Sequence, residues 1–259
     1  MPTLPDLASC KKVGFIVPSS NTAVEPITQA IIQSLNSNII CIFTRIEVKT
    51  VGTDANSTNQ FLTETMVAAA RLLADAQPDA IVWNGTSGMW VGSGLEADKQ
   101  LAKAMEDATG VPCSTTTLAT IEALTLFDVK TIGIAVPYNE ALAKKVEGFF
   151  KSNYAVSATR FLEPAPASNL EIAKSRPEDI SSLIKDAATR GQSIGAAKPK
   201  AIIVACTNWP AAGLVEELEQ ELDVIILDSI VVSVWMGLRM ADLQGPVPGW
   251  GRLMREVST

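Results

Sequence analysis

The 259-residue chain contains two similar halves. Residues 80–87, AIVWNGTS, resemble residues 201–209, AIIVACTNW, and these two motifs begin 121 positions apart. Pro18 and Pro137 each end a short apolar run, and they lie 119 positions apart. The near-equal offsets indicate a duplicated unit, so the fold of the first half is expected again in the second.

Apolar runs and helical patterns alternate along each half. The predicted strands are Val13–Val17, Ile39–Arg45, Ala80–Trp83 and Thr131–Val136, and the predicted helices are Ile27–Leu35, Phe61–Ala76, Leu95–Ala108 and Leu118–Leu126. This alternation predicts an α/β fold with mostly parallel sheets flanked by helices. We expect two pseudo-symmetric lobes, residues 1–127 and 128–259. The final helix, at about Ile230–Met240, could cross back onto the first lobe, and residues 245–251 are expected to be irregular.

Composition excludes several classes of function. The chain is 47% hydrophobic, with a net charge of −7 and a pI near 4.8, and it contains no cluster of Lys or Arg. We therefore expect no nucleic-acid partner and no anionic membrane partner. No apolar run reaches the ~18 residues of a membrane span, and the first residues lack the order of a secretory signal. A cytoplasmic protein is expected, and the sequence leaves its oligomeric state open, a homo-oligomer included.

The chain has no histidine. A Ser-His-Asp triad, a Cys-His dyad and a His-ligated metal site are therefore excluded. The spacing of the four cysteines gives no CxxC pair and no zinc pattern. Acid–base chemistry near neutral pH would have to use a Cys, Tyr, Lys or carboxylate with a perturbed pKa.

Ligands of open parallel sheets bind beyond the carboxyl ends of the strands. If the two lobes face each other, the loops at those ends share one site. The loops are Pro18–Thr22, Gly85–Gly88, Cys113–Thr117, Pro137–Asn139, Cys206–Asn208 and Asp228–Ser229.

Cys206 follows the second-lobe motif strand and precedes a predicted helix with a polar start. A thiol at a helix N-terminus is a proton donor or nucleophile, but a buried cysteine that serves packing alone is equally compatible with the sequence. Gly85 occupies the equivalent place in the first lobe, followed by Thr86 and Ser87. Their hydroxyls and the backbone N–H groups could cradle an oxyanion, or they could simply cap a helix.

Each of the other polar and aromatic candidates could have either a functional or a structural role. Tyr138 follows Pro137 at a strand end and is either a carboxylate ligand or a turn residue. Asn21 and Asn139 are typical helix caps, although Asn21 could also bind a carboxylate. Trp83, Trp90 and Trp209 could line a substrate pocket or pack the core. Cys113 could likewise line a substrate pocket or pack the core, and no role is expected for Cys10 and Cys41.

These segments resemble the aspartate/glutamate racemase superfamily, most closely the branch that holds maleate cis-trans isomerase and arylmalonate decarboxylase. VPSSNTAVEP is similar to the isomerase opening loop, NGTSGMWVGSG and ATGVPCSTTTLATIEAL are similar to decarboxylase segments, and VPYNE and VACTNWP fit both. The resemblance covers nearly the whole chain. It implies two α/β lobes with the active site between them.

The resemblance also implies a mechanism. Racemases of the superfamily carry one cysteine per lobe, and the isomerase uses the first-lobe cysteine as a nucleophile. Gly85 stands at that place here, which matches the decarboxylase. Thr86, Ser87 and Tyr138, with the backbone N–H groups of Ser87, Cys206 and Thr207, would then form a dioxyanion hole.

In that mechanism Cys206 protonates the enediolate left by decarboxylation of a small malonate-type carboxylic acid, without a metal or organic cofactor. Pro18 and Gly85 are expected to line the substrate site.

Three functions remain open at this point. Thr207, Asn208 and Trp209 replace the glycine-rich segment that follows the decarboxylase cysteine. Asn21 with Asn208 could hold a second carboxylate, as a maleate-isomerase-like or racemase-like enzyme would need. A non-catalytic carboxylate-binding protein is the third alternative. If the lobes face each other as expected, a Gly85→Cys substitution should introduce racemase-type proton exchange.

Overall fold

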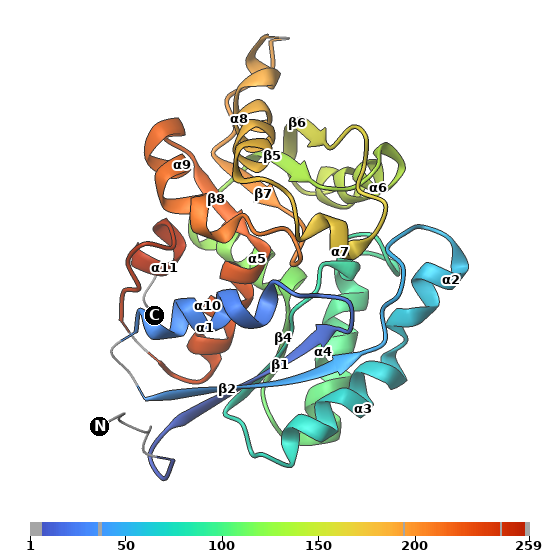
Figure 1. The fold of residues 1–259 in the computed structure, drawn as a ribbon, viewed down its shortest axis with the longest axis vertical. Helices are drawn as coiled ribbons and strands as arrows, with labels where there is room; N and C mark the ends of the chain where they lie inside the picture. The colour runs from blue at the N-terminus through green and yellow to red at the C-terminus, as the bar shows by residue number, and fades with distance from the viewer. Residues whose placement is uncertain (1–6, 36–37, 194, 244, 257–259) are drawn as a thin grey trace.

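Two parallel four-stranded sheets form the framework of the protein. A computed structural model describes residues 7–35, 38–193, 195–243 and 245–256 (Figure 1). The first sheet has the order β2-β1-β3-β4 and the second the order β6-β5-β7-β8, with every neighbouring pair parallel. The strands are β1 (Lys11–Pro18), β2 (Ile39–Ile46), β3 (Ala80–Trp83), β4 (Cys113–Thr115), β5 (Thr131–Val136), β6 (Ala155–Phe161), β7 (Ala201–Val204) and β8 (Ile225–Asp228). The identical strand order confirms the expected duplication and the α/β fold.

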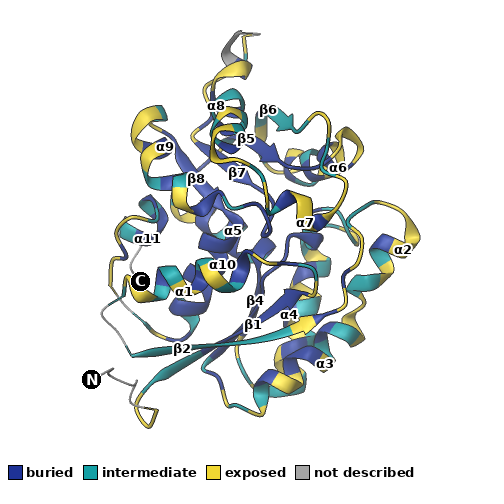
Figure 2. Ribbon diagram, in the orientation of Figure 1, coloured by how far each residue is buried: buried dark blue, intermediate teal, exposed yellow. Residues whose placement is uncertain are grey.

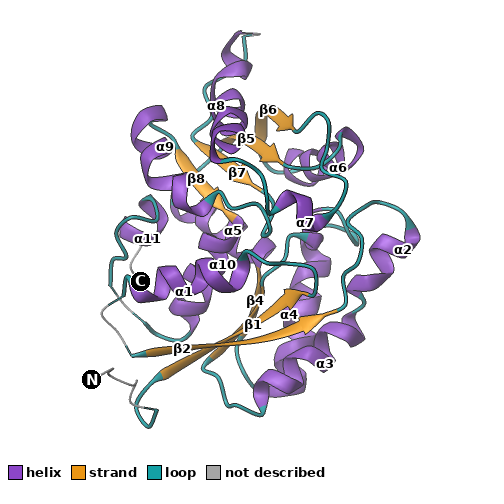
Figure 3. Ribbon diagram, viewed as in Figure 1, coloured by secondary structure: helices purple, strands orange, loops and turns teal. Residues whose placement is uncertain are grey.

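Helices connect the strands and cover both sheets (Figure 3). The α-helices are α1 (Val24–Gln33), α2 (Ala55–Thr58), α3 (Thr63–Ala74), α4 (Leu95–Thr109), α5 (Thr116–Leu126), α6 (Glu140–Lys151), α7 (Asn169–Ile172), α8 (Pro177–Ser193), α9 (Val215–Leu222), α10 (Ser229–Met240) and α11 (Arg252–Glu256). The described residues also include three 3₁₀ turns, which are η1 (Asn59–Phe61), η2 (Ser87–Met89) and η3 (Ala212–Leu214). Within the described ranges, no helix is long and apolar enough to cross a membrane.

The central strands are buried on both faces. The central strands β3 and β7 consist entirely of buried residues, and so does β8 at one edge of the second sheet, whereas the edge strand β2 is mostly half-buried (Figure 2). Continuous apolar strands of this kind are typical of parallel sheets covered by helices on both sides. One hydrophobic cluster runs from β1 and β3 through α5 and α10 into the second sheet. The two lobes therefore share a core.

Helix α10 belongs to the second half of the sequence but packs against α5 and β3 of the first (Figure 1). Its residues from Ser229 to Leu238 are all buried. Gly237 allows the close approach, because a Cβ there would lie 2.6 Å from Cγ1 of Val13 on β1. The division into lobes at residues 127 and 128 stays a prediction.

We predict that Gly237→Ala destabilises the protein by about 1–3 kcal/mol, because the added methyl overlaps a rigid buried valine. Gly148→Ala is the matched control. Gly148 lies in helix α6, where a Cβ would meet nothing within 4 Å. Alanine should there stabilise by about 0.5–1 kcal/mol, through helix propensity alone. Urea unfolding measures both, and a Gly237→Ala protein as stable as wild type would contradict this packing of α10.

Candidate active site

A small chamber lies where the strands of the two lobes end. All nine predicted site residues line it, together with five that sequence reasoning missed or left ambiguous. The predicted residues are Pro18, Asn21, Gly85, Thr86, Ser87, Tyr138, Cys206, Thr207 and Asn208, and the others are Val48, Val51, Phe61, Trp83 and Asn169. The chamber volume is about 30 Å³, which is roughly the space of one or two water molecules. It is a small site, built from both lobes.

A chain of hydroxyl and thiol groups crosses the chamber. The Oγ1 atom of Thr86, from the first lobe, lies 3.3 Å from the hydroxyl of Tyr138 in the second. That hydroxyl in turn interacts with the Cys206 thiol. Burial raises the pKa of Tyr138 well above its usual value, so the phenol stays protonated and can donate a hydrogen bond. The Trp90 ring packs edge-on against Tyr138, with 5.5 Å between ring centroids.

Cys206 is a buried thiol in a turn. Burial raises its pKa to about 11, and the hydroxyl of Tyr138 and the backbone N–H groups of Asn208 and Trp209 only partly oppose this rise. The expected position at a helix N-terminus is wrong, because the next α-helix, α9, begins only at Val215. At neutral pH the group is therefore a thiol, suited to donate a proton rather than to attack as a thiolate.

Hydrogen bonds from neighbouring elements hold the first-lobe loop, residues 85–88, in place. The Gly85 N–H donates to Oγ1 of Thr116 at 3.0 Å, and that hydroxyl lies 2.7 Å from the hydroxyl of Ser233 on α10. The indole Nε1 of Trp83 donates to Oγ of Ser87 at 3.2 Å. Thr86 stands at the N-cap of η2, but its hydroxyl bonds Tyr138 rather than the backbone of that turn. Capping alone does not explain the Thr-Ser pair.

Backbone donors differ from the expected set. The Cys206 N–H donates to the carbonyl of Val204 at 3.2 Å, so the expectation that it is a free oxyanion donor is wrong for this structure. Among the described residues, the N–H groups of Ser87 and Thr207 donate to no acceptor. These two N–H groups and the hydroxyls of Thr86, Ser87 and Tyr138 remain to hold a carboxylate.

Two asparagines of the site join the lobes. Nδ2 of Asn21 donates to Oγ1 of Thr207 at 3.1 Å, and Oδ1 of Asn208 accepts from the N–H groups of Thr22 and Ala23. Nδ2 of Asn208 donates to the carbonyl of Asn169 at 2.6 Å. The amides therefore already have protein partners, although each nitrogen has a second N–H to offer.

Some chamber residues could not be found from strand ends. Val48, Val51 and Phe61 lie in the segment between β2 and α3, and Asn169 opens α7. Ser168 caps α7 through the N–H of Glu171, so the sequence around Asn169 indicates only a helix start. Apolar loop residues carry no local signal of a site.

Other candidates lie outside the chamber. Asn139 caps α6 through the N–H of Leu142, and the thiol of Cys113 donates to the carbonyl of Val111. Cys10, Cys41, Trp90 and Trp209 do not line the chamber. Within the described ranges, no group of three or more Asp, Glu, Cys or His could hold a metal.

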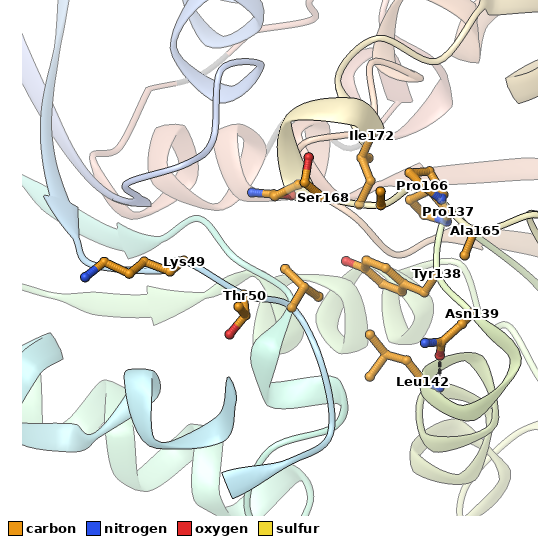
Figure 4. A pocket seen from close by; sticks show the side chains of 13 residues that line it. Lys49, Thr50, Pro137, Tyr138, Asn139, Leu142, Ala165, Pro166, Ser168 and Ile172 are labelled. Carbon is orange, nitrogen blue, oxygen red and sulfur yellow. Dashed lines mark hydrogen bonds between the residues drawn. The ribbon is translucent and has the colours of Figure 1, made fainter. Parts of the chain in front are cut away.

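A second cavity of about 180 Å³ adjoins the chamber and shares Val51, Tyr138 and Asn169 with it. Figure 4 shows Tyr138 extending from the second lobe toward the loop that carries Lys49 and Thr50. Pro166 and Ser168 lie above Tyr138 in this view, and Pro166 lies next to Pro137. These three shared residues therefore form the common wall between the second cavity and the chamber.

Asp228 places a buried carboxyl near the thiol. Its Oδ1 caps α10 by accepting the N–H groups of Ile230 and Val231, and Oδ2 has no partner in the part of the chain that the structure describes. Burial raises the pKa of Asp228 to about 7. Its negative charge contributes to the high pKa of Cys206.

The sequence of this chain is similar to a known protein family and to characterised relatives. Residues 13–254 match the family model described as arylmalonate decarboxylase. A maleate isomerase from Nocardia farcinica is 28% identical over 96% of this chain and 97% of its own. Arylmalonate decarboxylase from Bordetella bronchiseptica is 27% identical over 74% of this chain and 78% of its own.

Solved structures show the same fold. The maleate cis-trans isomerase of Nocardia farcinica, in a variant with a covalently bound succinylcysteine intermediate, superimposes with a TM-score of 0.82 at 22% identity. The match covers 96% of this chain and all of that one.

We predict that the stability of the Asp228→Asn variant, relative to that of the wild type, increases as the pH rises from 4.5 to 8. The unfolded carboxyl ionises near pH 4 and the folded one near pH 7, so the wild type loses stability across that window. Asparagine keeps an oxygen for the cap but does not ionise. The stability difference should shift by about 1 kcal/mol or more in favour of the variant, measured by urea unfolding at both pH values. An unchanged difference would mean that Asp228 does not titrate there.

Proposed function

The chain belongs to the arylmalonate decarboxylase family, and we propose that it is a cofactor-independent decarboxylase of a substituted malonate-type carboxylic acid. One observation carries this proposal. Of the cysteines, which all lie in the described residues, only Cys206 lines the chamber, and Gly85 stands at the equivalent place in the first lobe. A single proton donor on one face suits decarboxylation better than chemistry that needs two thiols.

Binding would use the donors that converge on the chamber. The hydroxyls of Thr86, Ser87 and Tyr138 and the N–H groups of Ser87 and Thr207 would hold one carboxylate of the substrate. The second carboxylate would lie against the apolar side chains of Val48, Val51 and Phe61. An ionised group is poorly solvated there, which favours its loss as neutral carbon dioxide.

The proposed chemical step needs no cofactor. The bond between the α-carbon and the second carboxylate breaks, and its electron pair stays on the substrate as an enediolate held by the same donors. The Cys206 thiol gives its proton to the α-carbon, and the thiolate recovers a proton from water. A thiol with a pKa near 11 is protonated at neutral pH, as this role requires.

A one-cysteine isomerase of a small dicarboxylic acid is the second candidate. The maleate isomerase relative covers more of the chain than the decarboxylase relative does. The amide groups of Asn21 and Asn208 also line the chamber and could hold a second carboxylate.

We predict that the wild-type enzyme releases carbon dioxide from a malonate and places one deuterium on the product in heavy water. Cys206→Ala should lower turnover by at least about 10²-fold, because a general acid contributes 10²–10⁴-fold. Cys113→Ala is the matched control, since that thiol is also buried but lies outside the chamber.

Mass spectrometry of a panel of malonates, maleate and amino-acid derivatives separates the candidates. Isomerised or racemised product without carbon dioxide would favour the isomerase. Thermal stabilisation by a carboxylate without any product would favour a binding protein. Full activity of Cys206→Ala would contradict the decarboxylase mechanism.

We also predict that kcat changes less than twofold between pH 8 and 9.5. The thiol acts in its protonated form and remains protonated in this range, because burial raises the pKa of Cys206 to about 11. A nucleophilic thiolate would instead become about tenfold more abundant for each pH unit, so kcat would rise by roughly thirtyfold. Initial rates over this range decide between the two roles of Cys206.

A further inference from the structure

We propose that Trp83 is a specificity-determining residue, whose indole fills the first-lobe position from which a second thiol would reach the substrate. The inference rests on the proposed function, because it explains why only Cys206 can deliver a proton. It concerns the first-lobe wall of the chamber, whereas Cys206 comes from the second lobe. It also identifies why residue 85 is a glycine.

The indole lies directly over Gly85. A Cβ built on Gly85 would lie 2.3 Å from Cζ2 of Trp83, 2.6 Å from Cε2 and 2.8 Å from Cη2. Real Cβ atoms essentially never approach heavy atoms more closely than 3.0 Å. The backbone of Gly85 is not in the left-handed region that favours glycine. The ring, not the backbone, therefore excludes a side chain at this position.

Trp83 has little freedom to move aside. Its side chain is 1% exposed, and its indole N–H is bound to Oγ of Ser87 at 3.2 Å. The Phe61 ring lies 6.2 Å from it, centroid to centroid, and Met66 belongs to the same buried cluster. A close-packed interior of this kind does not accommodate extra atoms without strain.

The hydrogen bond to Ser87 ties this packing to the dioxyanion donors. The indole N–H can only donate, so Ser87 must accept it through its oxygen. The hydroxyl hydrogen of Ser87 is then left for another acceptor, such as a substrate carboxylate. Trp83 thereby closes one face of the chamber and supports the group that binds substrate there.

This geometry corrects the expectation for Gly85→Cys. The single substitution does not place a thiol opposite Cys206, because the indole already occupies that space. A second proton donor requires two changes, one to remove the indole and one to supply the thiol. We expect Trp83→Leu combined with Gly85→Cys to create a two-faced site that neither single variant has.

The first test measures thermal stability and does not depend on enzymatic activity. Gly85→Cys should lower Tm by roughly 5 °C or more because of the overlap. Trp83→Leu should also lower Tm, since it removes part of a buried ring. The double variant should be at least about 3 °C more stable than the sum of the two shifts, because the smaller leucine side chain relieves the overlap. Additive shifts, or a Gly85→Cys protein as stable as wild type, would overturn the proposal.

The second test measures proton exchange. Each enantiomer of 2-phenylpropanoate is incubated in heavy water near pD 9, and loss of the α-proton is followed by NMR. A thiolate on one face accepts the α-proton and the thiol on the other face delivers a deuteron. Exchange with racemisation should rise at least about tenfold in the double variant over both single variants.

The matched control is Trp83→Leu with Gly85→Ala, which opens the same space without adding a thiol. Equal exchange in the control, equal exchange in Gly85→Cys alone, or exchange in none of the variants would overturn the role of Trp83. The stability cycle does not depend on the natural reaction. A wild type that releases no carbon dioxide but shows the non-additive Tm shifts would refute the decarboxylase and leave the assignment of Trp83 standing.

Discussion

Two sets of hydrogen bonds fix the distance between the two lobes at the point where their strands end. Asn21 donates to Thr207, and Asn208 accepts from the backbone N–H groups of Thr22 and Ala23. The side chains of Asn21, Thr207 and Asn208 are buried, so breaking one of the bonds leaves a donor or acceptor without water, at a cost of about 1–3 kcal/mol. The shared core around α10 adds a second constraint behind them. The donors of the first lobe are therefore held at a set distance from the thiol of the second.

Burial gives the chamber its chemical character. Because burial raises the pKa of both groups, Cys206 and Tyr138 keep their protons, and both can donate to a developing negative charge. The apolar side chains of Val48, Val51 and Phe61 make the same space unfavourable for a second carboxylate. One environment thus supports both parts of the proposed reaction, loss of a carboxylate and protonation of the carbon that it leaves.

The sequence predicted well what depends on strand ends. β3 and β5 have the predicted bounds, and every predicted site residue lines the chamber, because parallel strands bring their carboxyl ends together. It could not predict Val48, Val51 or Phe61, since their approach depends on the path of a long loop. It also could not predict that the Trp83 ring lies over Gly85, because that contact is set by side-chain packing. The start of α9 at Val215 was missed because η3 and a turn precede it.

Delivery of a proton from a single face is the central claim, and the stereochemistry of the product tests it most directly. A prochiral malonate with two different α-substituents, methyl(phenyl)malonate, would be decarboxylated in heavy water. Chiral chromatography would then give the enantiomeric composition of the deuterated acid. Cys206 acting alone opposite the Trp83 indole predicts one enantiomer with a single deuterium. A racemic product would contradict the account.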